Sequence, residues 1–303
     1  MPTANQRKIV GLGEILWDLL PAGKQLGGAP SNFAYISTLL GNEGIVASRL
    51  GQDALGNEAA RQLAQLGVNT SFLQTDATHP TGTVNVEVDH AGQPKFEIAE
   101  GVAWDFLECT ADWQKLATQA DAVCFGSLAQ RAPASRAAIR QFLDAARNTA
   151  VRVFDVNLRQ SFYSKEILAD SMDLADIVKL NHEELPKLAN LFGFDHRDEI
   201  SSADALVEMY KLKLICVTRG CRGSLLMSQL TLDEHPGYRI RVADAIGAGD
   251  AFTAALVQGY LRGSSMKEMN ERANRVGAWV ASKTGAMPKP GPGGLDHELA
   301  QIG

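Results

Sequence analysis

Short apolar runs alternate with helical patterns along most of the chain, and this alternation limits the possible folds more than any other feature. Runs that are apolar throughout are typical of parallel strands covered by helices on both faces. The expected strands are 8–13, 45–49, 122–125, 151–156, 177–180, 214–218, 224–227 and 238–242, with 230–232 less clearly marked. A first helix is expected after the glycine turn at 27–28 and ends at residue 40. The other expected helices are 54–66, 134–147, 165–174, 183–191, 202–210, 251–261 and 266–283. We therefore predict a doubly wound α/β fold, with a mostly parallel sheet flanked by helices, as a single domain over residues 1–303.

The alternation breaks between residues 80 and 104, where a period-two pattern replaces it. Apolar and polar residues alternate over 81–89, and Ala91-Gly92 resembles a hairpin turn before a second run at 95–98. An alternating hairpin is solvated on one face. We therefore expect it to form, with the extended segment 13–26, a small β lid rather than part of the core. The apolar side chains of Val84, Val86 and Val88 would favour a homodimer that pairs two lids.

Composition and charge exclude several classes of protein. The net charge is −6 without a basic block, so nucleic acid and anionic membranes are poor partners. No apolar run approaches the roughly 20 residues that cross a bilayer, and the polar start of the chain does not resemble a signal peptide. The cysteines lack CxxC spacing and the histidines lack HxxxH spacing, which argues against a metal site built from them. We expect a soluble cytoplasmic protein in which Cys124 and Cys216 are buried thiols.

A glycine turn ahead of a helix, Gly247-Ala248-Gly249-Asp250, predicts an anion site. Glycine lets the backbone approach a ligand closely, and the start of a helix offers free N–H groups at the positive end of its dipole. Asp250 would compete with an anion there unless it had a task of its own. It either caps the helix or accepts a proton from a hydroxyl group that attacks a bound phosphoryl group.

Polar residues follow several expected strands directly, at the edge where ligands gather in doubly wound sheets. They are Asp155, Asn157 and Arg159; Asn181 and Glu184; Thr218, Gly220 and Gly223; and Asp244 ahead of the glycine turn. Asn181 and Glu184 offer oxygen ligands of the kind that Mg²⁺ prefers. Taken singly, Arg159 is a surface cation, Asn181 is a helix cap, and Asp18 is either a turn residue or a ligand contact. Since the chain has no GxxxxGK[ST] loop, the Gly247–Gly249 turn would be the phosphate cradle.

Together these motifs resemble those of the ribokinase-like (PfkB) family of carbohydrate kinases. The resemblance covers nearly the whole chain, and the motifs stand in the family's order. They are Gly27, Gly28 and Asn32; Asn181 and Glu184; Thr218, Gly220 and Gly223; and Asp244, Gly247, Gly249 and Asp250. The segments 13–18, 100–105, 126–130 and 155–159 are most similar to those of bacterial fructokinases.

The resemblance implies a role for each matching residue. The sugar would be bound by Asp18, Gly28, Asn32 and Arg159. Asp250 would be the general base, and the amides of Gly247, Ala248 and Gly249 would hold the γ-phosphate of ATP. The nucleotide would be bound by Asn181, Thr218, Gly220, Gly223 and Asn274. Glu184 would hold Mg²⁺ through water, and the backbone of Asp244 lies where relatives bind a monovalent cation.

Two departures from the ribokinase pattern bear on the substrate. Ala29 and Leu16 stand where ribokinases carry lysine and asparagine, which counts against ribose. We therefore expect an ATP-dependent kinase that phosphorylates a primary hydroxyl of a free sugar, with fructose first among the sugars. A 2-keto-3-deoxygluconate kinase, a nucleoside kinase and a non-catalytic sugar or nucleotide sensor are the alternatives.

A third departure concerns potassium. Lys289 occupies a position where ribokinase supplies a serine oxygen to the ion, so its ammonium group either takes the ion's place or points to solvent. We therefore expect ATP and Mg²⁺ as cofactors and turnover that does not depend on K⁺.

Overall fold

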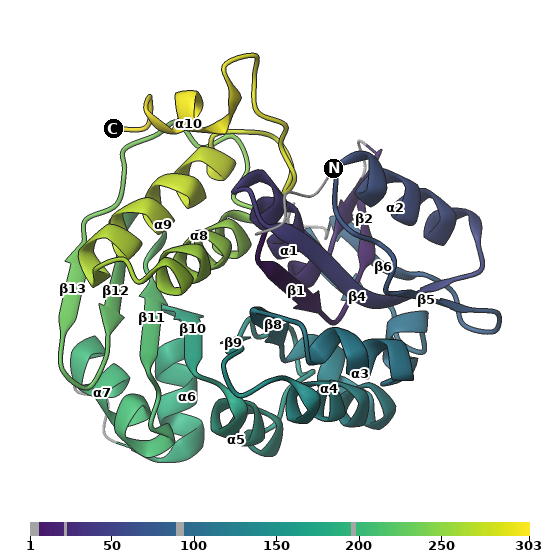
Figure 1. Cartoon of the computed structure of the whole chain (residues 1–303), viewed down its shortest axis with the longest axis horizontal. Coiled ribbons are helices and arrows are strands. Elements are labelled where there is room, and N and C mark those ends of the chain that lie inside the picture. The colour runs from purple at the N-terminus through teal and green to yellow at the C-terminus, as the bar shows by residue number, and fades with distance from the viewer. Residues whose placement is uncertain (1–5, 21–22, 89–93, 195–197) are drawn as a thin grey trace.

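A nine-stranded sheet forms the centre of the molecule (Figure 1). The computed structural model describes residues 6–20, 23–88, 94–194 and 198–303. Along the sheet the strands are β13 (Leu232–His235), β12 (Ser224–Met227), β11 (Leu214–Thr218), β10 (Ile177–Asn181), β9 (Val151–Asp155), β8 (Ala122–Gly126), β1 (Lys8–Leu12), β4 (Glu43–Gly51) and β5 (Leu73–Asp76). All neighbours pair in parallel except β12, which is antiparallel to both β11 and β13. The mostly parallel sheet predicted from the sequence is confirmed.

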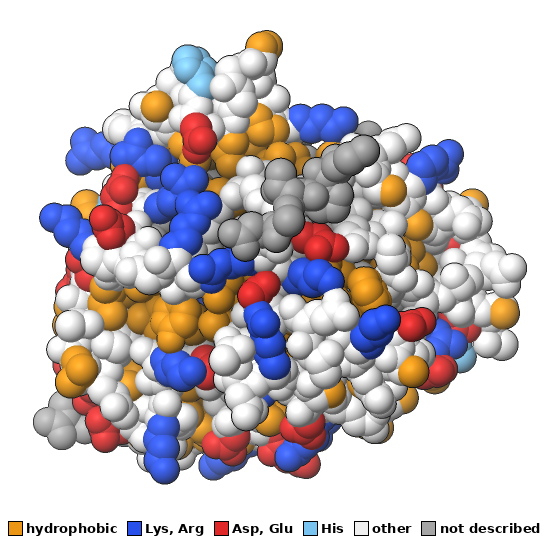
Figure 2. Space-filling model, in the orientation of Figure 1, with side chains coloured by type: hydrophobic (Ala, Val, Ile, Leu, Met, Phe, Trp, Pro, Cys, Tyr) orange, Lys and Arg blue, Asp and Glu red, His pale blue; other side chains and the backbone are white. Residues whose placement is uncertain are grey.

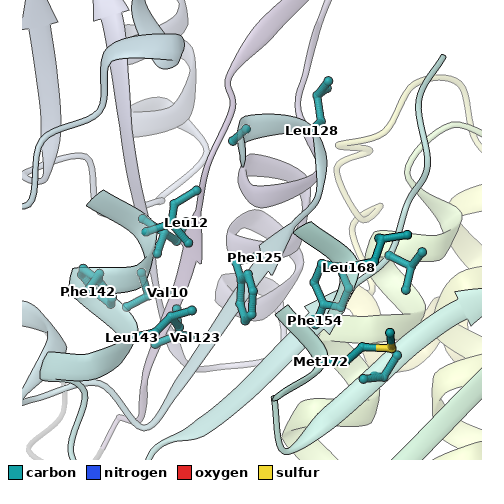
Figure 3. Close-up of a cluster of buried hydrophobic side chains, with 14 of the residues drawn as sticks. Val10, Leu12, Val123, Phe125, Leu128, Phe142, Leu143, Phe154, Leu168 and Met172 are labelled. Carbon is teal, nitrogen blue, oxygen red and sulfur yellow. The ribbon is translucent and has the colours of Figure 1, made fainter. Parts of the chain in front are cut away.

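Helices cover both faces of this sheet, as the apolar strands predicted. One face carries α1 (Ala29–Leu39), α2 (Ala54–Gln65), α8 (Ala248–Arg262), α9 (Met266–Ala281) and α10 (Gly294–Leu299). The other carries α3 (Ala111–Ala117), α4 (Pro133–Ala145), α5 (Lys165–Leu174), α6 (Glu184–Phe192) and α7 (Glu199–Tyr210). Successive strand residues enter opposite clusters, since Ile9 packs with the first set and Val10 with the second. Figure 3 shows Val10, Leu12, Val123 and Phe125 in the second cluster.

A separate four-stranded sheet forms the lid. Its order is β3 (Gly23–Gly27), β2 (Leu16–Leu20), β6 (Gly82–Val88) and β7 (Pro94–Ile98), so it combines the two segments predicted at about 13–26 and 80–104. Val84 and Ile98 are buried in the same cluster as Leu12, which fixes one face of the lid on the main body. Val84 is therefore not available for the predicted lid-to-lid dimer. The predicted turn at Ala91-Gly92 and the side chains of Val86 and Val88 lie outside the described residues.

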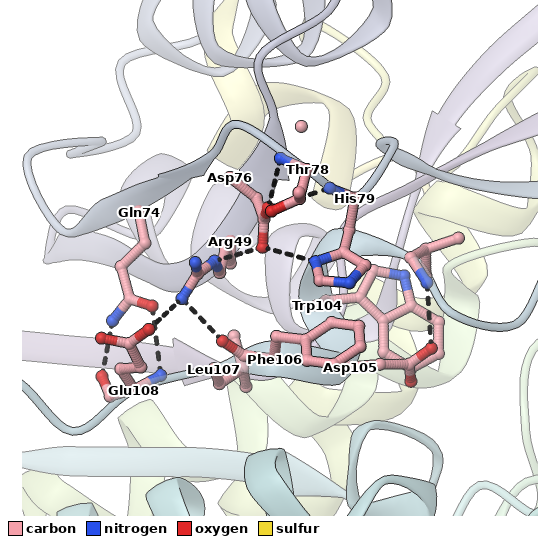
Figure 4. Close-up of polar contacts among 12 residues, drawn as sticks. Arg49, Gln74, Asp76, Thr78, His79, Trp104, Asp105, Phe106, Leu107 and Glu108 are labelled. Carbon is pink, nitrogen blue, oxygen red and sulfur yellow. Dashed lines mark hydrogen bonds and ion pairs between the residues drawn. The ribbon is translucent and has the colours of Figure 1, made fainter.

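Polar contacts anchor the base of the lid (Figure 4). Arg49 of β4 forms an ion pair with Asp76 at 2.8 Å, and its Nη1 donates to the carbonyl of Phe106 at 2.8 Å. Asp76 also accepts hydrogen bonds from the backbone N–H groups of Thr78 and His79. The segments that enter and leave the lid hairpin are thus both fixed to the edge of the main sheet.

Some sequence predictions were wrong or incomplete. The predicted strand at 238–242 does not form; residues 236–242 have no strand partner, and Val242 is 56% exposed. The run at 230–232 marked only the start of β13. The short strand β5 and the seven-residue helix α3 were missed, because elements of that length give little periodicity.

Two further sequence predictions concern exposure. Cys124 and Cys216 are buried free thiols, as expected. Within the described ranges, no helix is long and apolar enough to cross a membrane. Figure 2 shows acidic and basic side chains interspersed on one face of the molecule.

Candidate active site

The side chains of Asp250 and Asn32 meet although they lie 218 positions apart in the sequence. The Nδ2 of Asn32, in the first turn of α1, donates to Oδ2 of Asp250 at 2.7 Å. Two glycines allow this approach. A Cβ on Gly28 (φ 106°) would lie 2.4 Å from the carbonyl oxygen of Glu14, and one on Gly247 (φ 77°) would lie 2.5 Å from the Cβ of Ala286. The starts of α1 and α8 can therefore face each other at the carboxyl edge of the sheet.

Carboxyl groups gather around this contact. Burial and, to a smaller extent, the Asp155 carboxylate raise the pKa of Asp250 to about 6, against the opposing effects of the Asn32 hydrogen bond, Lys179 and Arg159. Burial likewise raises the pKa of Glu14 to about 7. Sequence reasoning missed Glu14 as a site residue, although it lies in the fructokinase-like segment 13–18. An acidic residue next to the apolar run 15–17 was the sequence feature that could have identified Glu14.

Arg159 and Asp18 complete the polar surroundings of the site. Arg159 is exposed, yet its charge lowers the pKa of three carboxyl groups, those of Asp250, Glu14 and Asp18. Burial has the larger effect on Asp18 and raises its pKa overall. Its Oδ2 lies 2.7 Å from the position that a Cβ on Gly27 would take. The structure therefore brings together the residues predicted to bind a sugar: Asp18, Gly28, Asn32 and Arg159.

The predicted phosphate cradle has the geometry of an anion site. Gly247 ends the loop in a left-handed conformation, and α8 starts at Ala248. The N–H groups of Gly247 and Gly249 have no hydrogen-bond partner in the described part of the chain, whereas that of Ala248 donates to Ala245 at 3.3 Å. Two of the three predicted amides are therefore free to bind an anion, and the third is held by a long bond.

The buried pair of Asp155 and Lys179 lies next to the cradle. The sequence marked Asp155 only as a polar residue after an expected strand, and it did not mark Lys179. Lys179 Nζ lies 3.1 Å from both carboxylate oxygens of Asp155. It also lies 3.0 Å from the position that a Cβ on Gly249 would take. Asp155 and Asp250 line the same small cavity, of about 10 Å³, together with Thr253 and Cys124. A lysine inside a strand predicted to be buried was the signal that could have identified this pair.

Asn181 and Glu184 bind the backbone in this structure. The Oδ1 of Asn181 accepts hydrogen bonds from the N–H groups of Glu183 and Glu184, in the turn that leads into α6. The carboxylate of Glu184 is buried and accepts from the N–H groups of Leu158 and Asn181, both at 2.8 Å. Glu184 thereby joins the loop after β9 to the end of β10. Burial raises its pKa, against the effect of Lys179.

The other predicted nucleotide residues lie at or just after the end of β11 and on α9. Thr218 pairs directly with Asn181 in the sheet, so the two predicted motifs are neighbours. Gly220 (φ 61°) borders open space, whereas a Cβ on Gly223 would lie 1.8 Å from the carbonyl oxygen of His235. Gly223 is therefore required for chain packing, whatever it does for a ligand. The Nδ2 of Asn274 donates to Ser224 at 2.7 Å, which fixes this amide on α9.

Asp244 joins two loops at the back of the cradle. Its carboxylate accepts the N–H of Ile246 at 3.0 Å and that of Gly285 at 3.2 Å. The carbonyl of the nearby Pro288 accepts from the hydroxyl of Tyr35 on α1 at 2.7 Å. Lys289 itself is exposed. This exposure favours the reading in which its ammonium group points to solvent.

Comparisons with known proteins give consistent results. A model described as "pfkB family carbohydrate kinase" matches residues 21–291. The fructokinase of Escherichia coli is 31% identical over 306 residues, covering 92% of this chain and 95% of that protein. The structure of an uncharacterized sugar kinase from Pyrococcus horikoshii in complex with ATP has a TM-score of 0.78 at 29% identity, covering 92% of this chain and 94% of that one. The fructokinase of Vibrio cholerae O395 with fructose, ADP and calcium ion bound shares the fold, with a TM-score of 0.81 at 23% identity over 98% of both chains.

Proposed function

Because the chain belongs to the pfkB family of carbohydrate kinases, we propose that it transfers the γ-phosphoryl group of ATP to a primary hydroxyl of free fructose. The E. coli relative is a fructokinase, and the P. horikoshii relative binds ATP; both cover nearly the whole chain. The resemblance of segments 13–18 and 155–159 to bacterial fructokinases supports the same substrate.

The observation that carries the proposal is a group of unpaired acceptors beside Asp250. The Oδ1 of Asn32 and the Oε2 of Glu14 are buried and have no hydrogen-bond partner among the described residues. Asn32 contacts Asp250 directly, and the charge of Asp250 affects the pKa of Glu14. Leaving a buried acceptor unpaired costs about 1–3 kcal/mol. A sugar offers several hydroxyl donors on adjacent carbons, which suits such a group of acceptors.

Asp250 would act as the general base. The sugar hydroxyl gives its proton to the Asp250 carboxylate while its oxygen forms a bond to the γ-phosphorus. The bond between that phosphorus and the bridging oxygen breaks, and ADP leaves with the electron pair. A general base works best when its pKa lies near the working pH, and a pKa of about 6 meets this condition.

The free N–H groups of Gly247 and Gly249 would stabilise the charge of the transferred group at the positive end of α8. Among the described residues, no cluster of three acidic, histidine or cysteine side chains could hold a metal by itself. Mg²⁺ would therefore be held mainly by the phosphates of ATP, whose charge it would reduce. Glu184 already accepts two backbone hydrogen bonds, and its remaining lone pairs would be available to waters of that ion.

The alternatives differ in what they ask of the pocket. Leu16 is buried and Ala29 is partly buried. Because both side chains are apolar, neither supplies the polar contact that ribokinases have at these positions. A 2-keto-3-deoxygluconate kinase would need a cation to bind the substrate carboxylate. Arg159, which is exposed beside the site, is the residue that would have to supply it. A sensor would not need Asp250 as a base. We place fructose ahead of these because of the relatives and motifs above.

Replacing the base tests the proposal. Asp250→Asn keeps the size and the hydrogen-bonding oxygen but cannot take the proton, so kcat with fructose and ATP should fall about 10²–10⁴-fold. Binding of fructose and ATP, measured by calorimetry, should change little. Asp112→Asn is a matched control, because Asp112 is an exposed aspartate in the first turn of α3. If Asp250→Asn kept wild-type turnover, Asp250 would not be the general base and would act only as a helix cap. Tight binding without turnover by the unmodified protein would favour the sensor.

A further inference from the structure

Lys179 is the buried lysine of the described chain, and it lies under the predicted phosphate cradle. It belongs to β10, where Ile177, Lys179 and Asn181 point to the same face. Ile177 on that face packs in the cluster that contains α8. This orientation brings the ammonium group to the first turn of α8, 3.0 Å from where a Cβ on Gly249 would be.

The charge of Lys179 is balanced by its surroundings. Burial alone would lower its pKa, but the carboxylates of Asp155, Glu184 and Asp250 outweigh that effect and raise it. The ammonium group therefore stays charged at any working pH. It has three N–H donors, and two of them face the oxygens of Asp155 at 3.1 Å. One donor is left for a ligand.

A phosphoryl group bound at the cradle would need that charge. It would lie among the carboxylates of Asp155, Glu184 and Asp250, which repel it in a partly dry site. Arg159 is exposed, and Lys289 lies at the surface. Lys179 is thus the fixed cation placed to offset the repulsion. Lys179 thus supplies the positive charge near the cradle that the sequence had suggested for Lys289.

We propose that Lys179 is a catalytic residue whose ammonium group contacts the transferred phosphoryl group beside Gly249, and that Asp155 positions it. This inference rests on the proposed function, because it concerns the group that is moved from ATP to the sugar. The contact strengthens as the bond to the bridging oxygen breaks and charge spreads over the transferred oxygens. Asp250 takes the proton of the sugar hydroxyl and Lys179 keeps its own.

The competing explanation is that Lys179 only neutralises Asp155 within the fold. Two variants separate these roles. Lys179→Met keeps the length of the side chain and removes the charge, but it leaves Asp155 buried without a partner. Lys179→Met combined with Asp155→Asn removes both charges and so leaves no unpaired buried carboxylate. Lys213→Met is the matched control, since Lys213 pairs with Asp176 at 2.8 Å just before β11.

Turnover and analogue binding are then measured on each protein. We expect kcat to fall about 10²–10³-fold in the single variant and to stay low in the double variant, as for the loss of one donor to a developing charge. Affinity for MgADP with aluminium fluoride and fructose should fall by a similar factor, while affinity for MgADP alone changes little. Recovery of turnover and of analogue affinity in the double variant would overturn the inference. Absence of turnover by the unmodified protein on every sugar would instead overturn the proposed function, and this inference with it.

Discussion

Asp250 carries a cost for the fold because it must be both charged and partly buried. Its nearest contacts are one hydrogen bond from Asn32 and the repulsive charge of Asp155. A carboxyl group whose pKa is higher in the folded state stabilises the fold only while it is protonated. That contribution is complete below the pKa of the unfolded chain, near 4, and is lost as the pH rises through the folded pKa of about 6.

Asp250→Asn should therefore stabilise the protein at pH 8, although it removes activity. The substitution should raise the free energy of unfolding by roughly 1–3 kcal/mol at pH 8, and by less at pH 4. Denaturant unfolding at the two pH values measures the difference. Asp144→Asn, at an exposed position on α4, should have the same small effect at both. If Asp250→Asn shows no pH-dependent gain, the carboxyl group is not strained in the folded state.

At the scale of elements, the site depends on how α8 begins. Gly247 has a left-handed conformation and lies against Ala286, so a side chain there meets the segment after α9. Gly263, at the other end of α8, has a similar φ of 71° but nothing within 4 Å of a Cβ. A side chain at either glycine would have to adopt the left-handed conformation, but only a side chain at Gly247 would also meet another segment.

Gly247→Ala and Gly263→Ala therefore make a matched pair. Gly263→Ala should lower stability by about 1–2 kcal/mol, the usual cost of a left-handed alanine, and Gly247→Ala by more because its Cβ also meets Ala286. In Gly247→Ala the cradle amides must also move, and a displacement of about 1 Å near the reacting atoms can cost about 10²-fold in rate. We expect Gly263→Ala to keep wild-type kcat in an ADP-release assay. Equal kcat in both variants would show that the cradle tolerates movement and that its amides are not essential.

The elements also show what could be predicted from the sequence. Apolar strands such as β8 and β11 and the long helix α8 were found because their patterns are strong. The segment 238–242 alternates like a strand but has no partner, and pairing across a sheet cannot be seen in a local pattern. Gly223 was assigned to the nucleotide, whereas its tight contact with His235 comes from the end of strand β13, which pairs with β12.

At the scale of the whole molecule, the motif residues could be predicted and their partners could not. Asp250, Asn32 and the cradle glycines were marked by local sequence motifs and by the family resemblance that those motifs carry. Glu14 and Lys179 were missed, and Asp155 was given no role, because their importance depends on three strands meeting at one edge, with β1, β9 and β10 far apart in the sequence. The lid was predicted from period-two alternation, and it packs on the main body through Val84. Whether two lids pair remains a prediction.

The central claim is that this site phosphorylates fructose in preference to related sugars. The most direct measurement is kcat/KM by ADP release, on the unmodified protein, for fructose, ribose, 2-keto-3-deoxygluconate and a nucleoside. We predict that fructose is preferred over ribose by about tenfold to a hundredfold, since each lost hydrogen bond is worth roughly 1–3 kcal/mol. A comparable preference for ribose, the keto acid or the nucleoside over fructose would contradict the assignment.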